Sequence, residues 1–368
     1  MRICLTANVA WNIWNFRRPL VRMLLAEGHE VQILAPPDET VESLIALGCA
    51  FTPLQMDRAG LNPLAELELL RRFDRHFRKT KPDVILSFTV KNNLFGALAA
   101  ARQGIPILPN VTGLGTAFLS GGVLRRIATS MYRIAFRKCR TVFFQNEDDR
   151  DLFVGAQIVR KDQAKILPGS GIDLDEFKPR PLPQTRSKTV FLMVARLLRD
   201  KGVVEFAEAA KIVREKRPEA VFRLMGEAGY VNRTAISQEL VDSWVEEGYI
   251  AYLGKHADVR DEIARADCVV LPSYREGAPR TLIEAAAMAR PTVTTDVPGC
   301  RAVVAHRTTG FLCAVRDPVS LAQSMLEFLD LDPHQRTRMG AAARAKMERE
   351  YSVERVVAAY RRELDSLG

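Results

Sequence analysis

Two glutamates lie eight positions apart in the second half of the chain, Glu276 before an expected turn and Glu284 inside an expected helix. The stretch begins with an apolar run over residues 268–272, which is typical of a buried parallel strand. Pro279 suits the first position of a helix, and Pro291 is expected to end that helix. The pattern therefore predicts a strand, a tight turn and a helix N-terminus.

A turn of this kind is suited to binding a diphosphate. The N–H groups at the start of the helix face the loop, with the positive end of the helix dipole behind them. Carboxylates there would repel phosphate, so we expect Glu276 to accept hydrogen bonds from a hexose and Glu284 from a ribose. The alternative is a solvated charge and a dipole partner at the helix end. The other donor-binding residues expected at this turn are Gly277, Ala278, Arg280, Thr281 and Leu282.

A second loop carries two cations. The apolar run 190–195 leads to Arg196 and Lys201, and a helix is expected from about Val203. Cations at the carboxyl end of a parallel strand can bind the same diphosphate, although a solvated surface loop is the alternative. Backbone near residues 252–255 is expected to contact the base, with Gly254 and Lys255 in the donor site.

These motifs resemble those of the family 4 retaining glycosyltransferases, which have the GT-B architecture. Glu276 and Glu284 match the paired-glutamate motif of that family, and Arg196 and Lys201 match its basic pair. The resemblance extends over nearly the whole chain. The segments that look like the bacterial branch acting on polyprenyl-diphosphate-linked sugars are 12–17, 88–93 and 110–115.

The resemblance implies a hexosyltransferase that retains anomeric configuration and needs neither metal nor cofactor. The expected donor is a UDP-sugar, with N-acetylhexosamine as first choice, and the expected acceptor is a polyprenyl-diphosphate-linked saccharide in polysaccharide or glycan assembly. Glu276, Arg196 and Lys201 are the expected catalytic residues. For acceptor binding we expect Asn12, Asn15, Arg17, Lys91, Asn92, Thr112 and Gly113, although an amide-rich loop after the first strand is also consistent with a satisfied turn.

Length and element order predict an α/β chain of two Rossmann-like domains. At 368 residues the chain exceeds one usual core. Strands and helices alternate in both halves, which predicts two parallel sheets facing across a cleft, as in GT-B proteins. We expect an acceptor domain at 1–176, a proline-rich linker at 177–187 and a nucleotide-sugar domain at 188–352. By resemblance, a helix at 353–367 packs back on the first domain.

The expected elements can be stated by residue range. The strands in the first half are 2–7, 30–35, 83–87, 106–109 and 141–145, and the helices include 14–27, 63–80, 92–103 and 122–138. In the second half the strands are 189–194, 220–225, 249–253, 268–272 and 291–295.

Positive charge is concentrated in the first half. The net charge is +9, and no acidic residue occurs between Asp83 and Glu147. Residues 123–136 predict a basic amphipathic helix, which suits either contact with an anionic membrane surface or core packing with a solvated basic face. Nucleic acid is not expected, because no zinc-finger, basic-zipper or aromatic RNA-binding pattern accompanies the charge. The residues expected on the apolar side of this helix are Leu124, Ile127, Met131, Ile134 and Ala135.

Six scattered cysteines without a C-x-x-C pair predict buried, reduced thiols. The chain shows no signal-peptide pattern and no apolar run near the ~20 residues of a membrane span. We therefore expect a cytoplasmic protein that is peripheral at the inner face of the membrane. The Asp173-Leu174-Asp175 segment has the spacing of a metal-binding motif, but its position favours a capping turn.

Two other classes of function stay open from the sequence. A nucleotide-sugar 2-epimerase shares the architecture but needs carboxylates and histidines in its cleft, and none of the five histidines lies in the 110–115 loop. A non-catalytic module that binds membrane or nucleic acid is the other alternative. Release of free epimerised sugar from the donor alone would identify an epimerase. A failure to hydrolyse a nucleotide sugar would identify a non-catalytic binding module.

Overall fold

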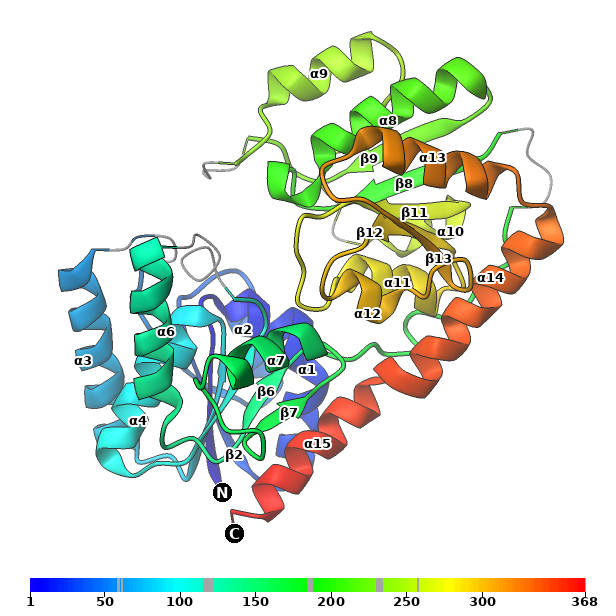
Figure 1. Cartoon of the computed structure of the whole chain (residues 1–368). Coiled ribbons are helices and arrows are strands. Elements are labelled where there is room, and N and C mark those ends of the chain that lie inside the picture. Colours follow the sequence, from blue (N-terminus) through cyan, green and yellow to red (C-terminus); the bar gives the residue numbers. More distant parts are fainter. Residues whose placement is uncertain are drawn as a thin grey trace. The chain divides into compact units, whose positions relative to one another are not determined.

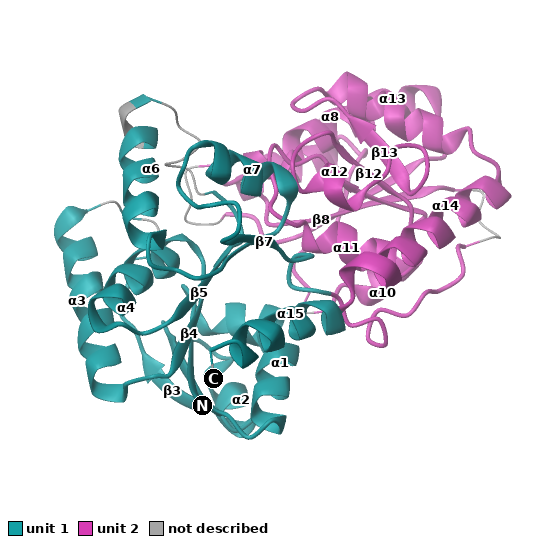
Figure 2. Ribbon diagram, turned by 60° about the horizontal axis from the view of Figure 1, so that its bottom comes forward, with its two compact units in different colours: residues 1–171, 353–368 teal, residues 172–352 magenta. Residues whose placement is uncertain are grey.

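The computed structural model describes residues 1–57, 60, 62–114, 122–183, 188–229, 234–256 and 258–367. The chain divides into two compact units (Figures 1 and 2). Unit 1 comprises Met1–Gly171 and Val353–Gly368, and unit 2 comprises Ile172–Ser352. The first division falls at Gly171, whereas the sequence placed it at residue 176.

Unit 1 contains a parallel sheet with the strand order β3-β2-β1-β4-β5-β6-β7. Ile3 of β1 is in register with Val31 of β2 on one side and Val84 of β4 on the other. The sequence prediction lacked β3 and β7, which are short and only partly buried. The strands are β1 (Arg2–Thr6), β2 (Glu30–Ala35), β3 (Ala50–Pro53), β4 (Val84–Phe88), β5 (Ile107–Val111), β6 (Val142–Phe144) and β7 (Ala164–Ile166).

Helices cover both faces of this sheet (Figure 1). One face packs against α1 (Ala10–Ala26), α2 (Val41–Ala46) and α15 (Val353–Asp365). The other packs against α3 (Pro63–Thr80), α4 (Ala97–Gln103), α6 (Gly122–Phe136) and α7 (Glu147–Gly155). A π-helical turn, Asn92–Gly96, precedes α4. Helix α3 begins where expected, because the Asn62 side chain accepts from the N–H of Leu64 and Pro63 occupies the first turn.

Helix α15 belongs to unit 1 (Figure 2). Aromatic and polar contacts anchor it there. The Tyr360 ring lies 4.9 Å from the Phe143 ring, measured between centroids. Glu363 accepts hydrogen bonds from the Thr141 hydroxyl and the Lys165 ammonium. The last helix thus completes the core of the unit that contains the N-terminus.

Unit 2 contains a second parallel sheet with the strand order β10-β9-β8-β11-β12-β13. Its core includes both faces of the sheet and the helices that follow each strand. The strands are β8 (Val190–Val194), β9 (Val221–Met225), β10 (Ala251–Tyr252), β11 (Cys268–Leu271), β12 (Thr292–Thr295) and β13 (Gly310–Cys313). The α-helices are α8 (Val203–Lys216), α9 (Gln238–Glu246), α10 (Arg260–Arg265), α11 (Arg280–Ala287), α12 (Cys300–Val303), α13 (Pro318–Leu329) and α14 (Pro333–Lys346). A 3₁₀ turn, Arg199–Lys201, precedes α8, and a π-helical turn, Met347–Tyr351, follows α14.

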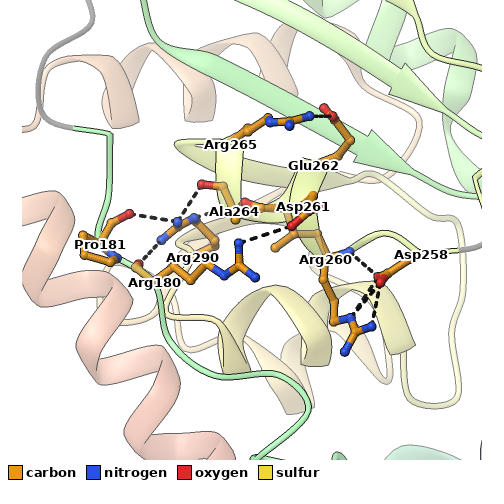
Figure 3. Close-up of polar contacts among 10 residues, drawn as sticks. Arg180, Pro181, Asp258, Arg260, Asp261, Glu262, Ala264, Arg265 and Arg290 are labelled. Atoms are coloured by element: carbon orange, nitrogen blue, oxygen red, sulfur yellow. Dashed lines mark hydrogen bonds and ion pairs between the residues drawn. The ribbon is translucent and has the colours of Figure 1, made fainter.

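Two arginines hold the start of the expected linker on unit 2. Arg290 is fully buried and donates to the carbonyls of Arg180 and Pro181, at 2.7 and 3.0 Å, and to Ala264 at 2.7 Å (Figure 3). Arg344 donates to the carbonyl of Phe177 at 2.8 Å. Residues 177–181 are therefore bound to unit 2 and do not form a free linker. Residues 184–187 of the expected linker lie outside the described residues.

The faces of α6 differ from the expectation. Tyr132, Ala135 and Phe136 are buried in the unit 1 core, whereas Ile127 is 51% exposed and Ile134 is 65% exposed. The two isoleucines therefore lie on the outer side of the helix. The side chain of Leu124, which was expected on the apolar side, lies outside the described residues.

Other expectations can be compared with the structure directly. All six cysteines are buried and free, as predicted. Asp173 Oδ1 accepts from the N–H groups of Asp175 and Glu176, which confirms a turn closed by this side chain. The described residues after it, up to 183, form no helix, so the turn does not cap one. None of the helices within the described part of the chain is both long and apolar enough to cross a membrane.

Candidate functional site

In unit 2 the loops after β8 and β11 lie at the point where the strand order reverses. Strands β8 and β11 are neighbours, and the chain continues from β8 toward β9 and from β11 toward β12. Ligands of open parallel sheets bind at the carboxyl ends of strands at such a switch point. The two loops predicted from the sequence to bind the donor therefore emerge next to each other.

The backbones of these two loops are in direct contact. The N–H of Tyr274 donates to the carbonyl of Asp200 at 2.9 Å. Gly202 has a φ of +75°, and a Cβ there would overlap the carbonyl of Pro272. Only glycine combines this positive φ with so close an approach. The loop that carries Lys201 and the loop that carries Glu276 are consequently held together by main chain.

Lys201 and Glu276 form an ion pair between these loops. Lys201 Nζ donates to Glu276 Oε1 at 2.5 Å, and Ser273 Oγ donates to the same oxygen at 2.7 Å. The side chains are 22% and 12% exposed for Lys201 and Glu276, so solvent screens the pair only partly. No partner for Glu276 Oε2 is found among the described residues. One carboxylate oxygen is fixed while the other remains available to a hydroxyl donor.

Glu284 is held by a different cation. Arg280 Nε donates to Glu284 Oε1 at 2.7 Å across one turn of α11, and the Glu284 side chain is 12% exposed. Burial raises the pKa of Glu284 above its ordinary value, and the positive charge of Arg280 opposes this shift only in part. The paired glutamates of the motif therefore differ in environment, although both are bound to a basic side chain.

The start of α11 is fixed against β8. Thr281 Oγ1 donates to the carbonyl of Val194, the last residue of β8, at 3.0 Å. The N–H of Leu282 donates to the carbonyl of Pro279 at 3.1 Å. This corrects the expectation that Leu282 offers a free N–H to a diphosphate, because its N–H is used in the first turn of the helix.

The remaining residues that were expected to bind the donor are more open. Arg196 is exposed and forms no ion pair with any residue that the structure describes. Lys255 pairs with Glu227 at 2.9 Å, and its side chain is 68% exposed. Gly254 has a φ of +71°, and its carbonyl accepts from the N–H of Gly226 at 2.9 Å. These residues lie in loops after β8, β9 and β10, at the same edge of the sheet.

Sequence reasoning missed one contribution to this site. Gly299, after β12, has a φ of +81°, and a Cβ there would overlap the carbonyl oxygens of Glu276 and Gly277. The Glu276 turn is therefore packed against a third loop. The Pro298-Gly299 pair was a turn signal in the sequence, but nothing in it indicated which backbone the loop approaches.

In unit 1 the equivalent switch point lies between β1 and β4, and its polar side chains point inward. Asn92 is fully buried. Its Nδ2 donates to Thr6 Oγ1 at 2.7 Å, and its Oδ1 accepts from Thr89 Oγ1 at 2.9 Å. Thr89 has a φ of +73°, which is unusual for a β-branched residue. Asn92 therefore holds the loop after β4 and is not placed to touch an acceptor, contrary to the expectation.

Lys91 is also used within unit 1. Its ammonium donates to Glu66 Oε1 and to the carbonyls of Asp57 and Gly60, the latter two at 2.7 Å. An ammonium has three donors, and these three partners use all of them. Arg17 is only 3% exposed, with its guanidinium 4.5 Å from the centre of the Phe88 ring. Neither cation offers the exposed group that was expected to bind a diphosphate.

A second buried chain of hydrogen bonds crosses the same edge of unit 1. Ser87 Oγ donates to Asn93 Oδ1 at 2.7 Å, and Asn93 Nδ2 donates to the carbonyl of Asn110 at 2.8 Å. Asn110 Nδ2 then donates to Tyr360 Oη at 3.1 Å. Asn93, Asn110 and Tyr360 were not among the expected site residues. The amide-rich pattern was visible in the sequence, but its inward direction was not.

Four other expected acceptor residues are exposed or half-buried, although the Oδ1 atom of Asn12 is itself buried. Asn12 lies on the first turn of α1, which begins four residues earlier than predicted, and its Oδ1 has no hydrogen-bond partner among the described residues. Asn15 is exposed, and Thr112 and Gly113 are half-buried after β5. Gly115, at the end of the same expected segment, lies outside the described residues.

Comparison with known proteins identifies the family. Residues 13–169 match the model of a glycosyl transferase 4-like domain, and residues 188–330 match the model of glycosyl transferases group 1. The chain belongs to the family 4 glycosyltransferases of GT-B fold.

Two curated relatives cover most of the chain. The N,N'-diacetylbacillosaminyl-diphospho-undecaprenol alpha-1,3-N-acetylgalactosaminyltransferase of Campylobacter jejuni is 28% identical over 346 residues, which is 90% of each chain. The UDP-Gal:alpha-D-GlcNAc-diphosphoundecaprenol alpha-1,3-galactosyltransferase of Escherichia coli is 27% identical over 74% of this chain and 72% of its own.

Solved structures agree with the fold. Anabaena HepE in complex with UDP-glucose superposes with a TM-score of 0.80 at 18% identity over the whole of both chains. WaaG, a glycosyltransferase involved in lipopolysaccharide biosynthesis, superposes with a TM-score of 0.71 at 15% identity over 96% of this chain and 98% of its own. At these identities the likeness concerns the fold alone.

Proposed function

We propose that this protein is a retaining hexosyltransferase that moves a sugar from a UDP-sugar to a polyprenyl-diphosphate-linked saccharide. The observation that carries the proposal is the Lys201–Glu276 ion pair at the switch point of unit 2. The acceptor class is supported by the two relatives, whose names both contain a diphospho-undecaprenol-linked sugar. N-acetylhexosamine is the first candidate for the transferred sugar, because one of those relatives transfers N-acetylgalactosamine.

The proposed reaction starts with cleavage of the bond between the anomeric carbon and the diphosphate. Negative charge grows on the leaving diphosphate, and cations placed there in advance stabilise the transition state. Lys201 and Arg196 supply this charge together with the start of α11. The position of Lys201 is set by Glu276, whose Oε1 it contacts.

The two glutamates bind opposite ends of the donor in this proposal. Glu276 keeps Oε2 for a sugar hydroxyl, because Lys201 and Ser273 both bind Oε1. Glu284 accepts from a ribose hydroxyl, with Arg280 holding its other oxygen. Since each carboxylate is paired with a cation, neither brings an uncompensated negative charge to the diphosphate.

Retention of configuration follows if the acceptor attacks from the face that the diphosphate leaves. The bond from the anomeric carbon to the phosphate oxygen breaks, a bond to the acceptor hydroxyl oxygen forms, and the hydroxyl proton passes to the departing phosphate. No protein nucleophile and no metal enters this sequence. On unit 1 the residues proposed for the acceptor are the exposed Asn15 and the half-buried Asn12, Thr112 and Gly113.

Contact with an anionic membrane surface is part of the proposal, because the acceptor is a lipid. The outer side of α6 carries Ile127 and Ile134. Next to Ile134 lies a hollow of about 700 Å³ whose lining includes four cations and the apolar side chains of Val154, Ile158 and Val159. Apolar and basic side chains together suit an anionic interface. The lining cations are Arg133, Arg137, Arg160 and Lys161.

A panel of UDP-sugars offered with synthetic polyprenyl-diphosphate mono- and disaccharides tests the function. The product is detected by its mass, and the anomeric configuration is assigned by NMR. We expect transfer from a UDP-sugar, retention, and an unchanged rate in chelator. Absence of transfer across the panel would overturn the proposal, and release of epimerised free sugar from donor alone would replace it by an epimerase.

A further inference from the structure

Tyr274 and Glu205 form a hydrogen bond close in sequence to the Lys201–Glu276 ion pair. The proposed reaction does not use this hydrogen bond. Tyr274 Oη donates to Glu205 Oε1 at 2.6 Å. Glu205 lies in the first turn of α8, four positions after Lys201, and Tyr274 lies two positions before Glu276. The contact thus joins the same two loops as the ion pair, at a second place.

Burial of the Glu205 carboxylate costs free energy that its hydrogen bonds offset only in part. The residue is only 9% exposed, and its Oε2 has no hydrogen-bond partner among the described residues. A buried carboxylate with an unpartnered oxygen destabilises a fold. Its other oxygen accepts from the Tyr274 hydroxyl. A hydrogen bond to a charged acceptor is stronger than a neutral one, so this contact is suited to fixing the position of Tyr274.

Tyr274 is also fixed from two other directions. Its N–H donates to the carbonyl of Asp200. The guanidinium of Arg316, after β13, lies 4.5 Å from the centre of its ring, within the range of a cation–π contact. The ring, hydroxyl and backbone of Tyr274 are therefore each held by a different segment of unit 2.

We propose that Tyr274 and Glu205 are positioning residues that keep the Glu276 carboxylate on the Lys201 ammonium. The inference rests on the proposed function, because the value of that alignment lies in binding the donor and its leaving group. When the Tyr274–Glu205 hydrogen bond is lost, the backbone contacts of the 273–276 turn remain. The side-chain contact that fixes the distance between this turn and α8 is then absent. Small displacements of charged groups in such a site reduce rates strongly.

Tyr274→Phe removes the hydroxyl and keeps the ring, which makes it the first variant to test. We expect transfer to slow by about tenfold, the loss that corresponds to one charge-assisted hydrogen bond. In a Glu276→Ala background the same change should have no further effect, since the group being positioned is absent. Tyr249→Phe, a half-buried tyrosine of unit 2 outside the switch-point loops, is the matched control and should not alter the rate.

Glu205 supplies a conservative rescue. Glu205→Ala should slow transfer as much as Tyr274→Phe, whereas Glu205→Gln keeps an acceptor for the Tyr274 hydroxyl and should recover most of the rate. A role in stability alone predicts equal losses with and without Glu276. That result, or a Tyr274→Phe rate within about twofold of wild type, would overturn the proposal.

A measurement independent of transfer separates this inference from the proposed function. Ammonium groups in ion pairs react slowly with acylating reagents, so the rate of Lys201 labelling, read by peptide mass, reports its pairing with Glu276. We expect faster labelling of Lys201 in Tyr274→Phe and Glu205→Ala and unchanged labelling of Lys211, which pairs with Glu247 at the surface. If wild-type protein transfers no sugar, the function fails while the labelling still decides the positioning role. Unchanged Lys201 labelling in both variants would refute the positioning role.

Discussion

The two sheets of this protein each have a switch point, and the two points use their polar residues differently. In unit 2 the polar groups meet at the surface, where Lys201 and Glu276 form a partly exposed ion pair. In unit 1 the corresponding groups turn inward, where Asn92 and Asn93 are buried and hydrogen-bonded. The switch point of unit 2 therefore brings charged side chains together, whereas that of unit 1 uses its amides to hold its own loops.

The largest effect is expected from breaking the ion pair of unit 2. Lys201→Ala and Glu276→Ala should each reduce transfer by ~10²–10³-fold, as loss of a preorganised charge-stabilising group does. The protein should stay folded, as checked by its melting temperature. Lys211→Ala removes a lysine from an exposed ion pair on α8 and should leave the rate unchanged. Near wild-type rates for both site variants would refute their catalytic assignment.

In unit 1 an equivalent substitution should affect stability more than donor chemistry. Asn92→Ala removes the amide that binds the hydroxyls of Thr6 and Thr89, although Thr6 keeps its hydrogen bond to the carbonyl of Leu34. We therefore expect a total loss of stability of about 1–3 kcal/mol. A fall in melting temperature of ~2–4 °C per kcal/mol is expected.

Asn15→Ala is the matched control for that change, because Asn15 is exposed on α1. It should leave the melting temperature unchanged and raise the KM for the acceptor severalfold. If Asn15→Ala lowered the melting temperature and Asn92→Ala changed only the KM for the acceptor, the assignment of Asn92 as a structural amide and Asn15 as a binding amide would be wrong.

The pKa of Glu284 gives a pH-dependent prediction. Because burial raises this pKa in the folded state, the folded protein prefers the protonated form more than the unfolded chain does. Stability from this group is thus fully present below the ordinary pKa of about 4.5 and is lost as pH rises through the raised value. Glu284→Gln should therefore melt higher than wild type at neutral pH but not at pH 4, while binding UDP more weakly.

Glu246→Gln, an exposed position on α9, serves as the control for that pH profile. Its melting temperature should follow wild type at every pH. A constant difference between Glu284→Gln and wild type from pH 4 to 8 would contradict the predicted titration.

The smallest effect is expected at the outer side of α6. Ile134→Asp places a negative charge beside the basic hollow and should weaken binding to vesicles that contain anionic lipid. Transfer to a short-chain acceptor in solution should be unchanged. Ile45→Asp alters an isoleucine of similar exposure, 52%, on α2 and should not affect vesicle binding. Equal binding by all three proteins would exclude this surface from membrane contact.

The sequence predicted the strands at both switch points but missed edge strands of each sheet. A continuous buried run and a helix that begins next to proline identify β11 and α11 without tertiary information. The proximity of the Lys201 and Glu276 loops could be predicted because the carboxyl ends of parallel strands lie at one edge of a sheet. Three short edge strands were missed: β3 and β7 lack a continuous buried run, and β13 was missed although it is mostly buried.

The direction in which a side chain points was the main feature that the sequence could not predict. Lys91 and Asn92 follow a strand just as Lys201 does, yet they turn inward because a strained Thr89 and a π-helical turn redirect the backbone after β4. Similarly, α6 has apolar residues on two sides, and periodicity could not tell which side packs: Tyr132 and Phe136 enter the core, and Ile127 and Ile134 do not.

The position of α15 determines how the molecule can be divided for experiments. Unit 2 is one uninterrupted stretch, Ile172–Ser352, and can be produced as such to measure nucleotide affinity by itself. A fragment that stops at Gly171 would lack Tyr360 and Glu363, leaving the Phe143 ring without its neighbour and Thr141 without its acceptor. A usable first half therefore requires joining the two separate stretches of unit 1 by a designed connection, or adding the last helix as a separate peptide.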